Sequence, residues 1–389
     1  MAEKGFPDGF LWGASTAAYQ VEGGIEYCDW AEAAREEKVP PAGRACDFYH
    51  RYEADFDIAK SLGMNAQRFS IEWARIEPEE GRFDEKEIEH YRALLRALHS
   101  RGLTPMVNLW HFTLPMWFSM RGGFLHADAP DRFARYCRFV VERLGGEAEL
   151  WLTHNEPMVY TSNGYLRGLW PPFLKNPFLF LRIISAVARA HRAAYTAMKQ
   201  ARPQIKVGIA KHNIFFEANA NPFNILLCTF MDWFWNHRFL NLIAGHQDFI
   251  GLNHYFHRKF GASAREQSEA ERSDMGWELH PTSLYECLRA LKRYNLPIYV
   301  SEHGLADAED SKRPKFIENA FQNLRRALQE GVALKGYFHW SLLDNYEWTY
   351  GFTQRFGLVE VNYETLERRV RGSAREYQRL IEESVKMKA

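Results

Sequence analysis

The sequence lacks an excess of charge of either sign, because 49 Lys and Arg residues balance 49 Asp and Glu residues in 389. Such a balance gives no sign of an electrostatic surface for nucleic acid or for an anionic membrane. Charged residues still make up 25% of the chain and hydrophobic residues 46%, as in folded globular proteins. The composition therefore predicts a folded protein without a nucleic-acid partner.

Cysteine is scarce and long apolar runs are missing. The five cysteines are an odd number without paired spacing, which predicts reduced thiols and a cytoplasmic location. The first residues lack the apolar stretch of a secretory signal, and no Asn-x-Ser/Thr glycosylation site occurs. The most apolar windows, Phe178–Val187 and Phe223–Trp235, are interrupted by Arg182 and Asp232 and are too short to span a bilayer. We therefore expect no membrane span.

No linker rich in Pro, Gly or Ser divides the chain, so we expect a single domain over residues 1–389. Short apolar runs, typical of strands that are buried on both faces, alternate instead with longer helical patterns. The expected strands are Phe10–Ala18, Met64–Ile71, Thr104–Trp110, Glu149–Thr153, Lys206–Ala210, Asp248–Asn253, Pro297–Ser301 and Gly336–Ser341.

The helical segments between these runs carry apolar residues on one face. In Glu85–Arg101 the apolar residues recur at helical spacing, and Asp84 with Glu87 is expected to form a capping box at its start. Eight strand–helix units in succession predict an α/β fold, a single (β/α)₈ barrel. A doubly wound sheet is the alternative, but no glycine-rich phosphate-binding turn follows any of the strands.

Two glutamates stand just beyond expected strands, Glu156 after the fourth and Glu302 after the seventh. Pro157 is expected to stop the first of these strands, and Gly304 to permit a tight turn after the second. Barrel enzymes build their active sites at the C-terminal ends of the strands, where these two side chains can face one substrate. One glutamate alone would more simply pair with an arginine. Two carboxyls across a substrate are the requirement for cleaving a glycosidic bond.

These motifs, taken in chain order, resemble those of the family-one glycoside hydrolases, the retaining β-glucosidases and β-galactosidases built on a (β/α)₈ barrel. The matching segments are Phe6–Gly23, Arg68–Ile76, His111–Pro115, Asn155–Pro157, Asp248–Asn253, Glu302, Phe338–Trp348 and Arg355–Leu358. The resemblance covers nearly the whole chain. It implies catalysis without a cofactor or a metal.

The resemblance also implies a role for each matched residue. Glu156 would be the acid/base and Glu302 the nucleophile that forms a covalent glycosyl-enzyme. Arg68 and Tyr255 would hold Glu302 ionised, and Asn155 would bind the 2-hydroxyl of the sugar. The other expected substrate-binding residues are Gln20, His111, Asn253, Trp340, Glu347, Trp348 and Phe356.

Glu347 bears on the class of sugar. The resemblance implies that a carboxylate here binds the hydroxyls of a neutral sugar, whereas phospho-sugar members carry a serine. An ionised Glu347 would repel a 6-phosphate, so we do not expect a phospho-glycosidase.

Several positions depart from the family pattern. His303, Phe112 and His254 replace the usual residues, and Ser301 replaces a threonine. His303 could alter the local response to pH or lie in a surface turn. The aromatic-rich segment 223–242 could line the entrance to the site, but packing as a barrel helix is the favoured interpretation.

The sequence thus predicts an exo-acting, retaining β-glycosidase that removes terminal β-D-glucosyl residues from small glycosides or oligosaccharides, with β-galactosidase or β-fucosidase activity beside it. Three alternatives stay open: an endo-acting cellulase-like or mannanase-like barrel, a non-catalytic sugar-binding relative, and a metal-dependent barrel hydrolase or isomerase. The last is suggested by 15 histidines and by His254 with His257, although no full ligand motif accompanies them. A homo-oligomer is compatible with all of these.

Overall fold

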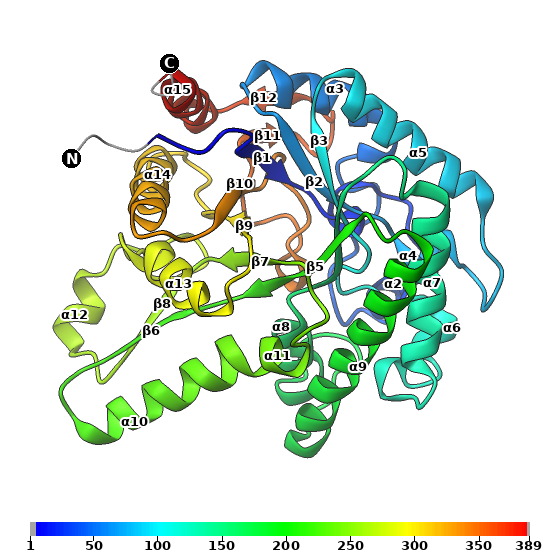
Figure 1. Cartoon of the computed structure of the whole chain (residues 1–389), viewed down its shortest axis with the longest axis horizontal. Helices are drawn as coiled ribbons and strands as arrows, with labels where there is room; N and C mark the ends of the chain where they lie inside the picture. The colour runs from blue at the N-terminus through cyan, green and yellow to red at the C-terminus, as the bar shows by residue number, and fades with distance from the viewer. Residues whose placement is uncertain (1–4, 387–389) are drawn as a thin grey trace.

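The computed structural model describes residues 5–386, and its centre is a closed barrel of eight parallel strands (Figure 1). The order around the barrel is β1-β10-β9-β7-β5-β4-β3-β2, so the last barrel strand closes on the first. These strands are β1 (Leu11–Ser15), β2 (Ala66–Ser70), β3 (Thr104–Asn108), β4 (Leu150–Asn155), β5 (Lys206–His212), β7 (Phe249–His254), β9 (Ile298–His303) and β10 (Leu334–Trp340). Each expected run forms one of them, so the predicted (β/α)₈ barrel is confirmed.

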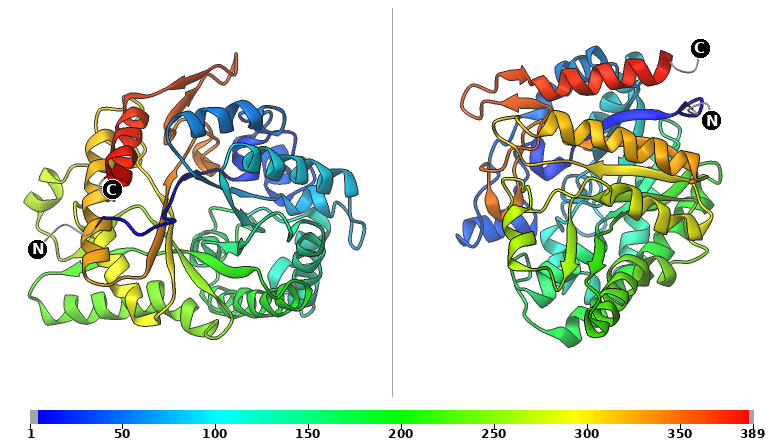
Figure 2. Two further views of the ribbon diagram at one scale, coloured as in Figure 1. Left: turned by 45° about the horizontal axis from the view of Figure 1, so that its top comes forward. Right: turned by 90° about the vertical axis from the view of Figure 1, so that its left-hand side faces the viewer.

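Helices cover the outside of the barrel (Figures 1 and 2). The main ones are α3 (Phe48–Ser61), α5 (Glu85–Ser100), α7 (Ala129–Leu144), α9 (Pro177–Ala201), α11 (Arg238–Leu242), α13 (Ser283–Leu291), α14 (Arg313–Gln329) and α15 (Gly372–Lys386). The helix predicted over residues 85–101 is α5, and the Asp84 carboxylate accepts a hydrogen bond from the Lys86 amide at 2.8 Å. The second half of the predicted capping box is wrong, because the Glu87 carboxylate accepts from the Tyr49 hydroxyl instead.

The barrel is filled by side chains rather than hollow. Its interior holds one buried group, which consists of Ala66, Met106, Leu150, Leu152, Ala210, Phe249, Tyr299 and Phe338. A second and larger core lies between the strands and the outer helices. The inner core supports the C-terminal ends of the strands, where the polar side chains gather.

Shorter elements occupy the segments between strands and helices. These are α1 (Ala18–Val21), α2 (Asp29–Arg35), α4 (Trp73–Ile76), α6 (Met116–Ser119), η1 (Gly123–Leu125), α8 (Pro157–Thr161), η2 (Ser162–Leu166), α12 (Ala264–Glu269), η4 (Lys292–Tyr294) and η5 (Trp348–Tyr350). Two small sheets join them, one of β6 (Phe215–Ala218) with β8 (His257–Phe260) and one of β11 (Val359–Val361) with β12 (Arg368–Val370).

Helix α10 (Pro222–Met231) does not pack as the sequence analysis expected. None of its residues is buried, and it runs along the lower edge of the molecule in Figure 1. The π-helical turn η3 (Asp232–His237) and α11 continue it, and only there are side chains such as Phe239 and Leu240 buried. Packing is therefore confirmed only for the end of this segment.

Within residues 5–386 no helix combines the length and the apolar character needed to cross a membrane.

Candidate active site

Glu156 lies at an abrupt change from strand to helix. It follows β4 directly and precedes α8, which begins at Pro157, a residue suited to the first helical position. Its backbone has a φ of 43°, a left-handed conformation that few residues other than glycine adopt. Its amide donates to the carbonyl of Ala210 on β5 at 2.8 Å. The carboxyl is thereby held at the C-terminal end of the barrel.

Glu302 is buried near the end of β9 and accepts two side-chain hydrogen bonds. The Arg68 guanidinium donates to Oε1, and the Tyr255 hydroxyl donates to Oε2 at 2.5 Å. Arg68 is itself fully buried and also donates to Asn155 Oδ1 at 2.7 Å. A buried arginine and a hydroxyl donor both favour the charged form of a carboxylate.

Asn253 joins the surroundings of the two glutamates. Its Nδ2 donates to Asn155 Oδ1 at 3.0 Å and to Glu156 Oε1 at 2.9 Å. Its own Oδ1 accepts from the Ser301 hydroxyl at 2.7 Å, which fixes the orientation of the amide. One hydrogen-bonded chain therefore runs from Glu302 to Glu156, and we call it the carboxylate cluster, consisting of Arg68, Asn155, Glu156, Asn253, Tyr255 and Glu302.

The protonation of Glu156 follows from this arrangement. Burial, and then the negative charge of Glu302, raise the pKa of Glu156 to about 8. The hydrogen bond from Asn253 and the charges of Arg68 and Lys211 lower that pKa but do not cancel the increase. Glu156 therefore holds a proton at neutral pH, as a group that protonates a leaving oxygen must.

Lys211 is a residue of the site that the sequence analysis missed. It lies near the end of β5, is fully buried, and its ammonium donates to the His212 carbonyl and to Asn213 Oδ1 at 3.3 Å. Burial lowers the pKa of Lys211 to about 7. A lysine immediately after the apolar run 206–210 was the available signal.

Gln20 and Glu347 form a second polar group. Gln20 Nε2 donates to Asn345 Oδ1 at 3.0 Å, to the Tyr346 carbonyl at 2.7 Å and to Glu347 Oε2 at 3.5 Å. Its Oε1 is buried and accepts no hydrogen bond from the described residues. Asn345, which orients this amide, was also missed from the sequence.

Burial and the charge of Glu302 raise the pKa of Glu347 to about 8. Glu347 is therefore mostly protonated at neutral pH in the free protein. An ionised Glu347 was expected to repel a 6-phosphate on the sugar. Because Glu347 is mostly protonated at neutral pH, that repulsion applies only at higher pH, and the expectation is corrected to that extent.

Aromatic rings surround these polar groups. The His111 ring lies nearly parallel to the rings of Trp340 and Trp348, with centroids 6.0 Å and 6.1 Å away. His111 Nε2 is 3.2 Å from Asn155 Nδ2, and burial together with Arg68 holds the pKa of His111 well below its usual value. Phe356 packs with Trp340, and the centroid of its ring lies 6.2 Å from that of Tyr255. The expected substrate-binding residues therefore lie around the carboxylate cluster.

Gly304 is required for space and not for a turn. Residues 304–307 form no turn and the φ of Gly304 is outside the left-handed region, so the expected tight turn is wrong. A Cβ atom at this position would lie 1.8 Å from the Trp340 carbonyl oxygen. Glycine thus allows β9 to approach the residue that ends β10.

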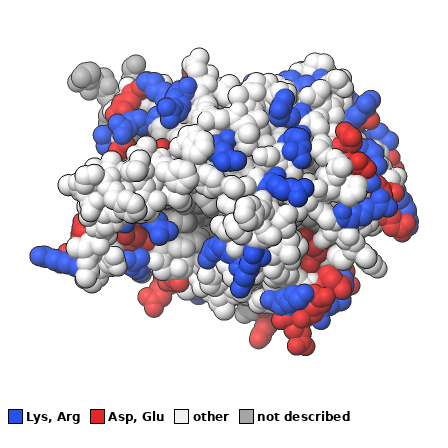
Figure 3. All heavy atoms as spheres, turned by 90° about the horizontal axis from the view of Figure 1, so that it is seen from below, with Lys and Arg blue, Asp and Glu red and all other residues white. Residues whose placement is uncertain are grey.

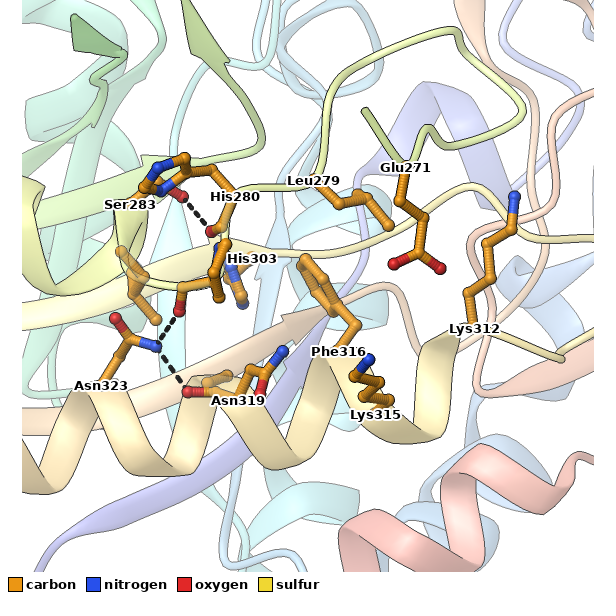
Figure 4. A pocket seen from close by; sticks show the side chains of 13 residues that line it. Glu271, Leu279, His280, Ser283, His303, Lys312, Lys315, Phe316, Asn319 and Asn323 are labelled. Carbon is orange, nitrogen blue, oxygen red and sulfur yellow. Dashed lines mark hydrogen bonds between the residues drawn. The ribbon is translucent and has the colours of Figure 1, made fainter. Parts of the chain in front are cut away.

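The departures from the family pattern lie on two sides of the strands. His303 Nδ1 is 3.1 Å from the Tyr337 hydroxyl and its ring stacks on Phe316 at 4.3 Å, so it faces α14. It lines a cavity of about 150 Å³ on the outside of the barrel (Figure 4), and the expected surface turn is wrong. His254 also faces outward, with Nε2 2.8 Å from the Ser283 hydroxyl. Phe112 instead joins the aromatic layer, 5.2 Å from Trp348.

The two histidines considered as a metal motif do not share a centre. His257 lies on β8, with Nε2 2.8 Å from Glu217 Oε2 and Nδ1 3.2 Å from Glu278 Oε1. Together with His280 and Glu217, His257 forms a group of possible ligands that includes neither catalytic candidate. These contacts hold β8 to the segment before α13.

The chain is similar to known glycosidases in sequence and in fold. The sequence model described as Glycosyl hydrolase family 1 matches residues 2–221 and 235–386. Beta-glucosidase A of Thermotoga maritima is 33% identical over 98% of this chain and 98% of its own. A solved beta-glycosidase from Pyrococcus horikoshii has a TM-score of 0.91 and 35% identity, covering 98% of this chain and 95% of that one. Beta-glucosidase from Thermotoga maritima in complex with noeuromycin has a TM-score of 0.91 and 32% identity, covering 98% and 99%.

Proposed function

The chain belongs to glycosyl hydrolase family 1, and on that premise we propose that Glu156 and Glu302 are its acid/base and its nucleophile. The chain is an exo-acting β-glycosidase, an O-glycosyl hydrolase of the β-glucosidase type. One observation supports the assignment of roles above the others. The two buried carboxyls share one hydrogen-bonded cluster, yet Glu156 holds a proton while Glu302 accepts from Arg68 and Tyr255.

In the first step, the Glu302 carboxylate attacks the anomeric carbon as the bond to the aglycone oxygen breaks. Glu156 gives its proton to that oxygen, so the aglycone leaves as a neutral alcohol. Arg68 and Tyr255 hold the Glu302 oxygens in place until the new ester bond forms. The sugar is then bound covalently to Glu302.

The second step reverses the roles. Once Glu302 is an ester it has lost its charge, and the repulsion that raises the pKa of Glu156 is gone. Glu156, now ionised, removes a proton from a water molecule, and the resulting hydroxide attacks the anomeric carbon and displaces Glu302. Two inversions leave the sugar with its original β configuration.

Polar and aromatic groups around the cluster support binding of one terminal sugar. We infer that Asn155 binds the 2-hydroxyl, next to the reacting carbon. The unpartnered Oε1 of Gln20 can accept from a sugar hydroxyl, and a protonated Glu347 can donate to another. Trp340 supplies an apolar surface for the sugar ring, with His111, Asn253, Trp348 and Phe356 around it.

We propose glucose as the preferred sugar, with galactosides and fucosides as further substrates. The five cysteines are all unpaired, which supports a cytoplasmic location for the proposed enzyme. We treat residues 1–389 as one catalytic domain, since the barrel draws its strands from nearly the whole chain.

The test compares initial rates of Glu302→Gln, Glu156→Gln and wild type on a panel of nitrophenyl β-glycosides. Glu302→Gln should show no measurable turnover. Glu156→Gln should lose about 100-fold to 10,000-fold on substrates with poor leaving groups, and much less on those with good ones. Glu142→Gln is the matched control and should keep wild-type rates, because this half-buried carboxylate on α7 pairs with Arg138 outside the carboxylate cluster.

The anomer released first is measured by NMR during the same reactions. The β anomer should appear before mutarotation. Full activity of Glu302→Gln, or initial release of the α anomer, would overturn the assignment.

A further inference from the structure

One side of the molecule leaves a series of large apolar side chains exposed to water. Phe178, Phe223 and Leu226 expose 79%, 70% and 68% of their surface. The series, here called the apolar face, consists of Leu166, Leu169, Leu174, Phe178, Leu181, Phe223, Ile225, Leu226, Phe230, Trp233 and Leu242. Phe180 of α9 and Phe234 of η3 have ring centroids 5.9 Å apart, so these segments are joined. Monomeric proteins seldom expose so large an apolar patch without a binding role.

Helix α10 is the centre of this face. Its sequence from Pro222 to Met231 contains no charged residue, and the fold buries none of its side chains. A helix of this composition in a globular protein normally packs an apolar side against the core. The stretch missing from the family match, residues 222–234, coincides with α10 and the start of η3. The centre of the face therefore lies in a segment that the family model does not match.

Basic residues accompany the apolar face. Residues 157–247 contain ten Lys and Arg residues and only two acidic ones, although the whole chain is balanced. Exposed members are Arg167, Lys175, Arg182, Arg189 and Arg192. Figure 3 shows this side as a broad uncharged area with Lys and Arg side chains across its middle. The exposed arginines and lysine of this segment thus make its surface basic, although the whole chain carries no net charge.

We propose that the apolar face docks on an anionic lipid bilayer. Exposed Phe, Leu and Trp side chains insert at the boundary between headgroups and acyl chains, while Lys and Arg beside them attract anionic headgroups. A second copy of this chain would bring two basic surfaces together, which like-charge repulsion opposes. Since no described helix can cross a membrane, the attachment is to the surface. The inner leaflet of a cell membrane offers the required negative charge.

Two chains of contacts connect this face to the proposed active site, one to Trp348 and one to Tyr255. Leu169 precedes Trp170, whose ring lies 5.6 Å from that of Trp348. On the other side, Trp235 donates to His212 Nδ1 at 3.1 Å, and the His212 ring stacks on Tyr255 at 6.2 Å. A docked molecule would hold the site beside the lipid. Together with the proposed glycosidase function, on which this step rests, docking on a bilayer indicates a class of substrate. The substrates are glycosides whose apolar aglycone is embedded in the bilayer.

Vesicle co-sedimentation tests the docking without relying on catalysis. Wild type should sediment with phosphatidylcholine vesicles that contain phosphatidylglycerol, and less with phosphatidylcholine alone or at high salt. The double variants Phe223→Ser/Leu226→Ser and Arg182→Gln/Arg189→Gln should each partition at least about tenfold more weakly. Val385→Ser on α15 and Arg96→Gln on α5 replace exposed residues elsewhere and should bind as wild type does.

Catalysis is measured in parallel on two substrates. All four variants should hydrolyse a soluble nitrophenyl β-glucoside at wild-type rates. The two double variants should be slower on a long-chain alkyl β-glucoside held in the anionic vesicles.

Several results would overturn the proposal while the glycosidase assignment stands. One is an active wild type that fails to sediment with anionic vesicles, and another is equal binding to uncharged vesicles. A third is a wild-type dimer, seen by light scattering, that Phe223→Ser/Leu226→Ser converts to monomer, since a second copy would then cover the face. Conversely, vesicle binding without hydrolysis of either substrate would refute only the proposed function.

Discussion

Lys211 shows how one side chain can adjust the chemistry of another. Its buried ammonium lowers the pKa of Glu156, while burial brings the pKa of Lys211 itself to about 7. The amine is therefore partly charged at the pH where Glu156 must hold its proton. We propose that Lys211 acts on catalysis through Glu156, as a positioning residue.

We predict that Lys211→Met moves the alkaline limb of the pH profile of kcat/KM to higher pH. Removing a positive charge leaves the protonated form of Glu156 more favoured, so its pKa rises and the acid persists further into the alkaline range. Initial rates on a nitrophenyl β-glucoside across pH measure this. Lys206→Met is the control, because that lysine lies on the same strand but pairs with Glu149 at the surface. An alkaline limb that stays in place or moves to lower pH would contradict the role.

Residue patterns predicted which side chains gather, but not how they bond. The two glutamates and Tyr255 stand at strand ends, and a barrel brings such positions together, while Arg68 reaches Glu302 from within β2. The contact of Ser301 with Asn253 depends on which neighbouring strand the side chain meets, a long-range property. Lys211 bonds only to the two residues that follow it, but its complete burial depends on the rest of the fold. Likewise, the raised pKa of Glu347 results from burial that its local sequence does not reveal.

At the scale of helices and strands, a helix end can be predicted from sequence where a neighbouring residue supplies its capping hydrogen bond. Asp84 caps α5 within three residues of sequence, but Glu87 binds Tyr49 on α3, a contact between separate helices. The eight barrel strands were found because both their faces are buried, which leaves an apolar run. The ladder of β6 with β8 was missed because it extends two neighbouring barrel strands, β5 and β7, beyond the barrel.

We predict that Asp84→Ala lowers the free energy of unfolding by about 1 kcal/mol, because the Lys86 amide loses its acceptor at the start of α5. Urea unfolding measures the change. Asp128→Ala is the control, since Asp128 precedes α7 at the same capping position but its side chain makes no capping hydrogen bond. Equal losses in both variants would mean that the cap is not the cause.

For the whole molecule, buried carboxyls set an unusual dependence of stability on pH. Burial raises the pKa of Asp29 to about 8, and its Oδ1 accepts from the amides of Trp30 and Leu114 at 2.9 Å and 2.8 Å. A carboxyl with a raised pKa stabilises the fold fully at low pH, and that contribution is lost as pH rises through about 8. Buried histidines such as His111, with lowered pKa values, act in the opposite direction.

We predict that Asp29→Asn is more stable than wild type above about pH 8 and that the difference shrinks toward pH 4. Asparagine keeps the accepting oxygen but carries no charge to bury. The difference in unfolding free energy between variant and wild type, measured by urea titration across pH, isolates Asp29 from the histidines. Asp131→Asn, at an exposed position of α7, should show no such trend. A difference independent of pH would rule out the buried charge as its origin.

The closure of the barrel has a consequence for biosynthesis. Strand β1 pairs on one side with β10, so the edge formed by residues 11–15 stays unpaired until residues 336–340 have been synthesised. Trp340, which ends β10, is also one of the residues around the carboxylate cluster. A nascent chain therefore carries an open sheet with two free edges until residues 336–340 have emerged from the ribosome, and the residues around the carboxylate cluster are complete only after that.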